Sequence, residues 1–274
     1  MMRLLTLIIT LFITTATTLS GEYQRIASLA EIQHELDALT PDDIAVFDVD
    51  LTLIIPKDKI VRPCGFGLLR ILKSELLLTN EQVEEYGSAA MTQLKTGLFE
   101  PIALTMVHRL QQRQVPVIAL TAIRTGAFGC IPSVEGWRFN QLLDLNFDFR
   151  KAFAGNPGGI LLTNSAGKAT STFYNGIIAS GDEPKGEALA ALFENLHWRP
   201  NLVIFVDDCL DFIESVEDSM QCLGIPCKSF HYVAYEYLNE TLDEEVAHFQ
   251  IDHFYNTKIW LSDEQAQELL RKAS

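Results

Sequence analysis

The chain has 274 residues, of which 48% are hydrophobic, and a formal net charge of −15 at pH 7. This length and apolar content allow a full α/β core, built as one domain with an insertion or as two small domains, and they argue against a disordered chain. The acidic balance argues against a nucleic-acid partner, because affinity for that polyanion comes largely from Lys and Arg side chains that neutralise phosphates.

The N-terminus resembles a secretory signal. Arg3 precedes an apolar stretch over residues 4–13, and small and hydroxylated residues follow up to Ser20 and Gly21. We therefore expect residues 1–20 to be a signal peptide, residues 21–274 to form the mature domain, and the protein to be exported to the periplasm or secreted. An uncleaved membrane anchor is the alternative, although the apolar run is shorter than the roughly 20 residues that a transmembrane helix needs. We expect no membrane span after the signal is removed.

The chain has five cysteines, which cannot all form disulfides with one another. Export would permit disulfides. Cys222 and Cys227 flank a Gly-Ile-Pro turn and could pair, as could Cys64 and Cys130 if the fold brings them together. Buried, unpaired thiols are the alternative.

The first half of the mature chain predicts two buried strands separated by helices. The continuous apolar run 44–47 is typical of a buried strand, and so is 115–120. Helical spacing is found over 29–39, 66–78, 80–94 and 101–114. This alternation predicts a parallel sheet with helical crossovers.

The second half continues the alternation. Residues 158–164 and 173–181 are expected to be short strands on either side of a polar turn, 164–170, after a helix over 137–145. A helix over 187–196, a third buried strand over 201–208, a helix over 210–223 and a fourth strand over 228–233 follow. The fold class is therefore α/β, with a parallel sheet flanked by helices.

Carboxylates follow two of the predicted strands. Asp48 and Asp50 leave the first strand, and Asp207 and Asp208 end the third. In open parallel sheets the ligand crevice lies outside the carboxyl ends of the strands, so these acids are expected to meet there. Two or three carboxylates are a suitable ligand set for Mg²⁺, which prefers oxygen. Alternatively, Asp207 and Asp208 are helix-entry acids, which a helix N-terminus favours.

The second strand and a later helix supply groups that suit a phosphoryl ligand. Thr121 ends the strand, Ala122 follows it, and Lys185 stands at a helix start. A hydroxyl, a backbone N–H group and an ammonium would stabilise the charge on phosphoryl oxygens. Taken singly, Lys185 is a solvated lysine and Arg124 a surface charge more often than a ligand-binding group.

The ordered set DVDLT, ALTAIR, Lys185 and FVDD resembles the motifs of the haloacid dehalogenase (HAD) superfamily, phosphatase type, over residues 44 to about 233. The resemblance implies a Rossmann-like core and a Mg²⁺-dependent reaction through an aspartyl-phosphate. It makes Asp48 the nucleophile and Asp50 the general acid and then base. A carboxylate nucleophile divides the displacement into two steps.

The same resemblance implies the remaining roles. Thr121, Ala122 and Lys185 would bind phosphate, Lys185 would also be catalytic, and Arg124 would contact the substrate. The metal ligands would be Asp48, Asp50, Asp207 and Asp208; which of the last two ligates directly is open, although the Gly-Asp form of the motif favours Asp208.

Members of this superfamily select substrates with cap insertions. Residues 56–98 stand where a small helical cap would be inserted, and residues 126–180 are a second candidate insertion. Alternatively, these helices only cover the core. The export signal, the Gly136-Trp137-Arg138 segment and the Val-Asp-Asp ending also resemble a poorly characterised exported HAD-like group of intracellular Gram-negative bacteria.

We therefore expect an exported Mg²⁺-dependent hydrolase that acts on a small phosphorylated substrate. One alternative is a secreted binding protein on the HAD fold with little or no catalysis, whose partner would be a host protein. Another is a phosphotransferase that passes the phosphoryl group to an acceptor other than water. Fold and motifs alone do not prove an activity.

Overall fold

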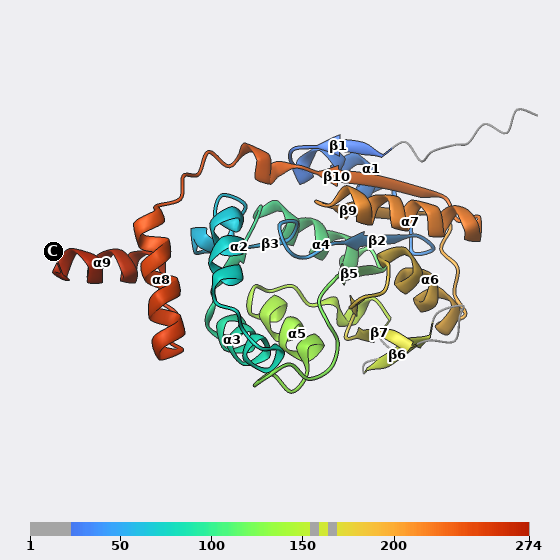
Figure 1. Ribbon diagram of the computed structural model, residues 1–274. Coiled ribbons are helices and arrows are strands. Elements are labelled where there is room, and N and C mark those ends of the chain that lie inside the picture. The colour runs from blue at the N-terminus through green and yellow to red at the C-terminus, as the bar shows by residue number, and fades with distance from the viewer. Residues whose placement is uncertain (1–22, 154–158, 164–168, 274) are drawn as a thin grey trace, which may run out of the picture.

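A mostly parallel sheet forms the centre of the computed structural model, which describes residues 23–153, 159–163 and 169–273 (Figure 1). Within these residues, eight strands pair in the order β1-β10-β9-β2-β5-β8-β7-β6. The parallel members are β1 (Gln24–Ile26), β10 (Cys227–Tyr232), β9 (Val203–Asp207), β2 (Ile44–Phe47), β5 (Val117–Thr121) and β8 (Ile177–Ala179). The predicted fold class, α/β with helices on both faces of a mainly parallel sheet, is confirmed.

The three buried strands expected from apolar runs are confirmed as β2, β5 and β9, and the predicted fourth strand is confirmed as β10, which is partly buried. Their ends differ from the predicted ones by a few residues, because hydrogen bonding to the neighbouring strand, and not composition, decides where a strand stops. The chain also adds β1, which pairs with β10 at the sheet edge and was not predicted.

The segment 126–180 extends the main sheet. It contains α5 (Val134–Asp144), β6 (Ile160–Thr163), β7 (Ala169–Tyr174) and β8, and β6 and β7 pair antiparallel. Because β8 pairs parallel with β5 and antiparallel with β7, these short strands continue the sheet beyond β5. Residues 164–168 of the predicted turn, like the predicted signal, lie outside the described residues.

The segment 56–98 leaves the core and returns to it at one place. β3 (Ile54–Pro56) and β4 (Thr96–Leu98) pair antiparallel, with Ile54 opposite Leu98. Between them lie α2 (Phe66–Glu75) and α3 (Asn80–Gln93), as the helical spacing predicted. Thr79 caps α3 by accepting a hydrogen bond from the Gln82 N–H group.

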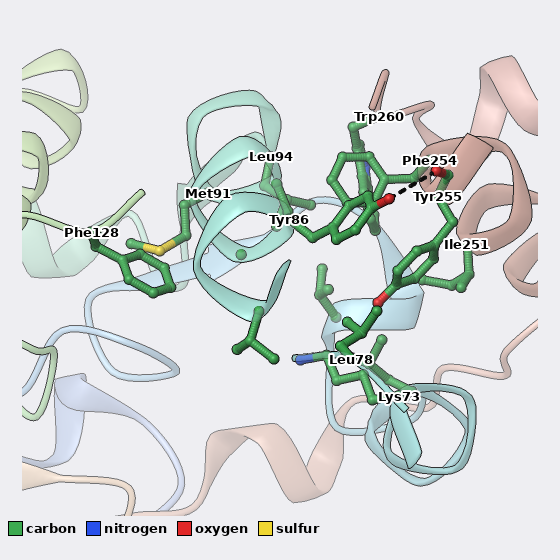
Figure 2. A pocket seen from close by; sticks show the side chains of 15 residues that line it. Lys73, Leu78, Tyr86, Met91, Leu94, Phe128, Ile251, Phe254, Tyr255 and Trp260 are labelled. Atoms are coloured by element: carbon green, nitrogen blue, oxygen red, sulfur yellow. Dashed lines mark hydrogen bonds between the residues drawn. The ribbon is translucent and has the colours of Figure 1, made fainter. Parts of the chain in front are cut away.

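Two C-terminal helices that were not predicted complete this region. α8 (Glu244–Thr257) lies beside α2 and α3, whereas α9 (Asp263–Ala273) points away from the sheet (Figure 1). Ile60 and Leu72 pack against Ala247 and Ile251 of α8. Figure 2 shows the cavity that lies between α2, α3 and α8. Within the described ranges, no helix is long and apolar enough to cross a bilayer.

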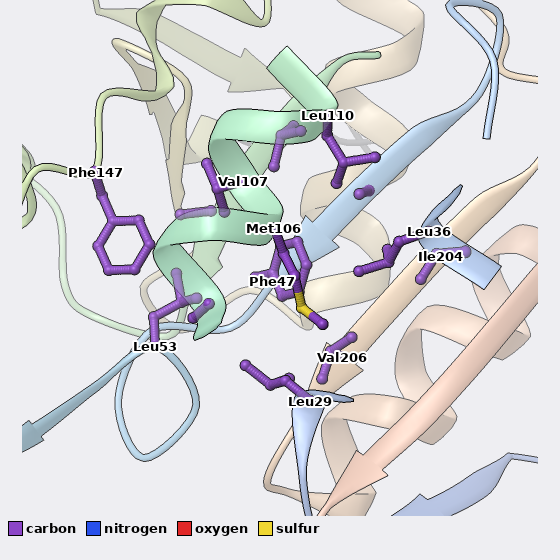
Figure 3. Close-up of a cluster of buried hydrophobic side chains, with 14 of the residues drawn as sticks. Leu29, Leu36, Phe47, Leu53, Met106, Val107, Leu110, Phe147, Ile204 and Val206 are labelled. Carbon is purple, nitrogen blue, oxygen red and sulfur yellow. The ribbon is translucent and has the colours of Figure 1, made fainter. Parts of the chain in front are cut away.

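Successive residues of each buried strand point to opposite faces of the sheet, so two separate cores form. Covering the first face are α1 (Gln33–Ala38) and α4 (Ile102–Gln112), and its cluster includes Leu36, Phe47, Met106, Val107 and Val206 (Figure 3). Covering the second are α6 (Lys185–Asn195) and α7 (Leu210–Leu223), with Val46, Leu120, Leu189, Phe205 and Val216. Burial on both faces explains why the strands are continuous apolar runs.

The cysteine pairings considered from the sequence do not form. All five thiols are free, so neither Cys64 and Cys130 nor Cys222 and Cys227 are joined. The alternative of five buried thiols is also wrong, because Cys130 and Cys222 are exposed. Cys222 ends up on the solvent side of α7, whereas Cys227 begins β10.

Candidate functional site

Asp48 is fixed by the strand that it follows. Its N–H group donates to the Val206 carbonyl at 2.9 Å, which continues the pairing of β2 with β9 beyond the strand end. The chain then turns tightly, because the Val49 carbonyl accepts hydrogen bonds from the N–H groups of Leu53 and Ile54, and Leu51 takes a φ of 61°. Asp48 is 5% exposed and Asp50 is accessible, so the turn separates a buried acid from a solvated one.

Lys185 lies between two carboxylates. It is fully buried at the start of α6, and its Nζ donates to Asp48 Oδ1 at 2.5 Å and to Asp207 Oδ2 at 2.7 Å. The Phe212 ring lies 4.3 Å from the ammonium, measured to the ring centroid, and adds a cation–π contact. The predicted lysine is therefore in direct contact with the first and third strand ends.

Gly186 allows this placement of Lys185. A Cβ atom at position 186 would lie 1.9 Å from the Ser215 carbonyl oxygen of α7, so only glycine permits the two helices to approach so closely. The Gly186 N–H group also donates to Ser215 Oγ at 3.0 Å. Close packing of α6 on α7 thus places the start of α6 next to the acids.

The two acids at the end of β9 have different partners. Asp207 is fully buried, and both of its oxygens are occupied: Oδ2 by Lys185 and Oδ1 by the Cys209 N–H group at 2.8 Å. Asp208 is partly exposed and lines the cavity next to Asp48 and Asp50. Asp207 therefore holds the lysine, whereas the Asp208 carboxylate faces the cavity.

Asp50 is oriented by a residue from a distant helix. Arg138 of α5, which is 4% exposed, donates from Nη2 to Asp50 Oδ2 at 2.8 Å, and its Nη1 donates to Gln141 Oε1 at 2.6 Å. The Asp50 side chain is 52% exposed. The guanidinium thus holds one oxygen of an otherwise accessible carboxylate.

The structure places Thr121 and Ala122 in the acid cavity and Arg124 outside it. Thr121 and Ala122 line the same cavity as Asp48 and Asp208. Arg124 instead pairs with Glu84 of α3, at 3.7 Å, and lies over the Phe128 ring. Only Ile123 stands between Ala122 and Arg124 in the sequence, yet the Arg124 side chain is directed toward α3.

Burial dominates the electrostatics of the cluster. It raises the pKa of Asp48 to about 7 and that of Asp207 to about 6, although Lys185 favours the charged form of both. Burial and the neighbouring Asp48 charge raise the pKa of Asp208 to about 7. Burial alone would lower the pKa of Lys185, but its two carboxylate partners outweigh that effect and raise it. The cluster thus contains three carboxyl groups and one ammonium, so negative charge exceeds positive charge when the acids are ionised.

These acids fit a divalent cation. Asp48, Asp207 and Asp208 each offer a carboxylate oxygen, and the three oxygens lie within 4.8 Å of one another. Asp48 Oδ2 is buried and has no hydrogen-bond partner among the described residues. An unpartnered buried oxygen is costly, and a hard cation such as Mg²⁺ would both satisfy it and neutralise the excess charge.

Sequence reasoning missed two residues that organise the site. Arg138 has a local signal, because it lies between Val134 and Leu142 at helical spacing, all three are buried, and a charge within an apolar stripe needs a buried partner. Phe212 has no such signal, because only the packing of α7 brings its ring over Lys185.

The chain is similar to proteins whose activity is not known. A family model, described as a protein of unknown function (DUF2608), matches residues 25–267. An uncharacterised protein of Rickettsia prowazekii is 25% identical over 244 residues, which are 88% of each chain. A second protein of that species is 24% identical over 66% of this chain and 57% of its own length, and one of Rickettsia felis is 23% identical over 77% and 66%.

Proposed function

Because the chain belongs to the DUF2608 family of proteins of unknown function, we propose its activity from the site itself: a Mg²⁺-dependent phosphomonoester hydrolase of the HAD type. The observation that supports this most directly is the buried lysine that bridges Asp48 and Asp207, next to Asp50, Thr121 and a shared cavity. We also propose export, on the signal-like residues 1–20.

Asp48 is the proposed nucleophile. Lys185 holds Oδ1 and so orients the carboxylate, whereas Oδ2 has no hydrogen-bond partner among the described residues and is the oxygen that a cation would satisfy. One oxygen of the Asp48 carboxylate would form a bond to the phosphorus of the ester as the ester P–O bond breaks. The Thr121 hydroxyl, at the cavity wall, would donate a hydrogen bond to a phosphoryl oxygen.

Asp50 is the proposed acid and base. Its carboxyl would give a proton to the leaving alcohol and then take one from the water that attacks the phosphorus and releases Asp48. The hydrogen bond from Arg138 fixes Asp50 Oδ2 and leaves Oδ1 to exchange the proton.

Asp48 and Asp208 would hold Mg²⁺, because both carboxylates line the cavity, whereas both oxygens of Asp207 already have partners. The ion would supply Lewis-acid stabilisation of phosphoryl charge. Asp207 is assigned the separate role of positioning Lys185.

The test is phosphate release from a panel of phosphomonoesters by the chain from Gly21 onward, in Mg²⁺ and in EDTA. Release that needs Mg²⁺ and is lost in Asp48→Asn is the expected result, together with a phosphoryl group trapped on the wild-type enzyme. Asp42→Asn, at an exposed position next to the same strand, is the matched control and should retain activity. No release from any ester, and no trapped phosphoryl group, would favour a binding protein instead.

A further inference from the structure

The cavity above the acids has an apolar wall. Besides Asp48, Asp50, Asp208 and Thr121, its lining includes Leu51, Pro56, Val61, Phe66, Ile123 and Phe212. Among the described residues, no Arg, His, Asn or Gln side chain lines this cavity of about 460 Å³. Away from the acids and Thr121, which the proposed reaction engages, the apolar wall offers a leaving group rich in hydroxyls, such as a sugar, no side-chain hydrogen bonds in place of the water that it would lose.

A second cavity, also of about 460 Å³, lies between α2, α3 and α8 (Figure 2). Its wall is apolar and aromatic, with Tyr86, Met91, Phe254, Tyr255 and Trp260 among the lining residues. The Tyr86 hydroxyl already donates a hydrogen bond to the Tyr255 carbonyl oxygen, at 3.4 Å. This volume falls within the range of about 300–1,000 Å³ that is usual for ligand pockets.

The two cavities adjoin along α2. Val61, just before α2, lines both of them. On α2, Phe66 lines the acid cavity, and Leu69 and Lys73 line the second. Spacings of three and seven residues place these side chains on one face of the helix, so a single face extends from the acids into the second cavity.

We infer that the substrate is a phosphomonoester of an alcohol with a hydrocarbon chain. This inference rests on the function proposed above. The phosphoryl group would lie at Asp48, the first carbons against Val61 and Phe66, and the rest of the chain in the cavity between α3 and α8. Burial of a chain in these walls is favourable in proportion to its apolar area, which gives a selectivity that hydroxylated esters cannot obtain here.

The experiment compares kcat/KM for butyl, hexyl and octyl phosphate with that for glycerol 3-phosphate and glucose 6-phosphate. Up to about fourfold per buried methylene is expected, hence a rise on the order of 100-fold from butyl to octyl phosphate. Release of phosphate with no dependence on chain length would overturn the inference but leave the phosphatase intact. Release from no ester, butyl phosphate included, would refute the phosphatase itself.

Two variants on α3 test where the hydrocarbon chain of the substrate lies. Ala90 lines the second cavity, so Ala90→Phe should fill it and reduce the octyl-to-butyl ratio at least about tenfold. Ala89, the neighbouring residue, does not line it, and Ala89→Phe should keep the ratio. An unchanged ratio in folded Ala90→Phe would contradict the placement; if this variant does not fold, the wild-type series still decides.

An anionic head group could instead lie at Lys73. Binding measured by calorimetry distinguishes a head group at Lys73 from one at the Asp48 site. Octyl phosphate should bind to Asp48→Asn with Mg²⁺ present, and Lys73→Met should change its affinity less than about threefold, because an exposed lysine side chain contributes little. Two results together would place the head group at Lys73 and overturn the assignment: octanoate binds as tightly as octyl phosphate, and its binding is lost in Lys73→Met.

Discussion

Replacement of Lys185 by methionine tests whether one buried ammonium holds the site together. The ammonium is fully buried and lies 2.5 Å from Asp48 Oδ1 and 2.7 Å from Asp207 Oδ2. Lys185→Met keeps much of the side-chain length but leaves two buried carboxyl groups facing each other. Removal of one partner from a buried ion pair costs about 3–5 kcal/mol, and proton uptake by the carboxylates offsets part of that cost.

This loss is large relative to a total stability of about 5–15 kcal/mol. For a domain of this size, about 2–4 °C in Tm corresponds to each kcal/mol, so a decrease of about 6–20 °C is expected. Thermal unfolding followed by circular dichroism at pH 7 in EDTA measures it. The matched control is Lys228→Met, which removes a pair with Glu35 in which the lysine side chain is 49% exposed; about 0–1 kcal/mol is expected there. Equal, small losses in both variants would refute the reasoning.

Three further predictions concern packing, orientation and pH. Gly186→Ala should cost about 1–3 kcal/mol in urea unfolding, because the helices must separate, whereas Gly67→Ala, where a Cβ meets nothing within 4 Å, should be neutral or stabilising by up to about 1 kcal/mol. Arg138→Lys keeps the charge but not the two-pronged geometry, so kcat on the best ester should fall about 10- to 100-fold; an unchanged kcat would show that Asp50 needs no guanidinium. Because the pKa of Asp208 is raised to about 7 in the folded protein, above about 3.9 in the unfolded chain, the folded state binds more protons and unfolding free energy in EDTA should fall as pH rises from about 4 to 7. Asp208→Asn should reduce that dependence without removing it, because the pKa values of Asp48 and Asp207 are raised as well, and a slope equal to that of the wild type would contradict the burial effect.

The site could be anticipated where its groups stand at the ends of local patterns. Asp48, Thr121 and Asp207 each follow an apolar run, and a parallel sheet brings such ends to one edge. Arg124 shows the limit of this reasoning, because it directly follows the cavity-lining Ile123, yet its partner is Glu84 of α3. A motif places a backbone position, whereas packing decides where a long side chain points.

The α/β class, three buried strands, a fourth strand and most helices could be predicted from the sequence, because hydrophobic periodicity and capping residues act within a few positions of each other. The sequence also contained an unused signal for α8, because the apolar residues Ala247, Ile251 and Phe254 stand at helical spacings of four and three residues, and all three are buried. The strand order, the contact of Arg138 with Asp50 and the apolar cavity beside α2 could not be predicted from the sequence. These depend on free energies of contact between segments far apart in the chain, for which no local pattern is required.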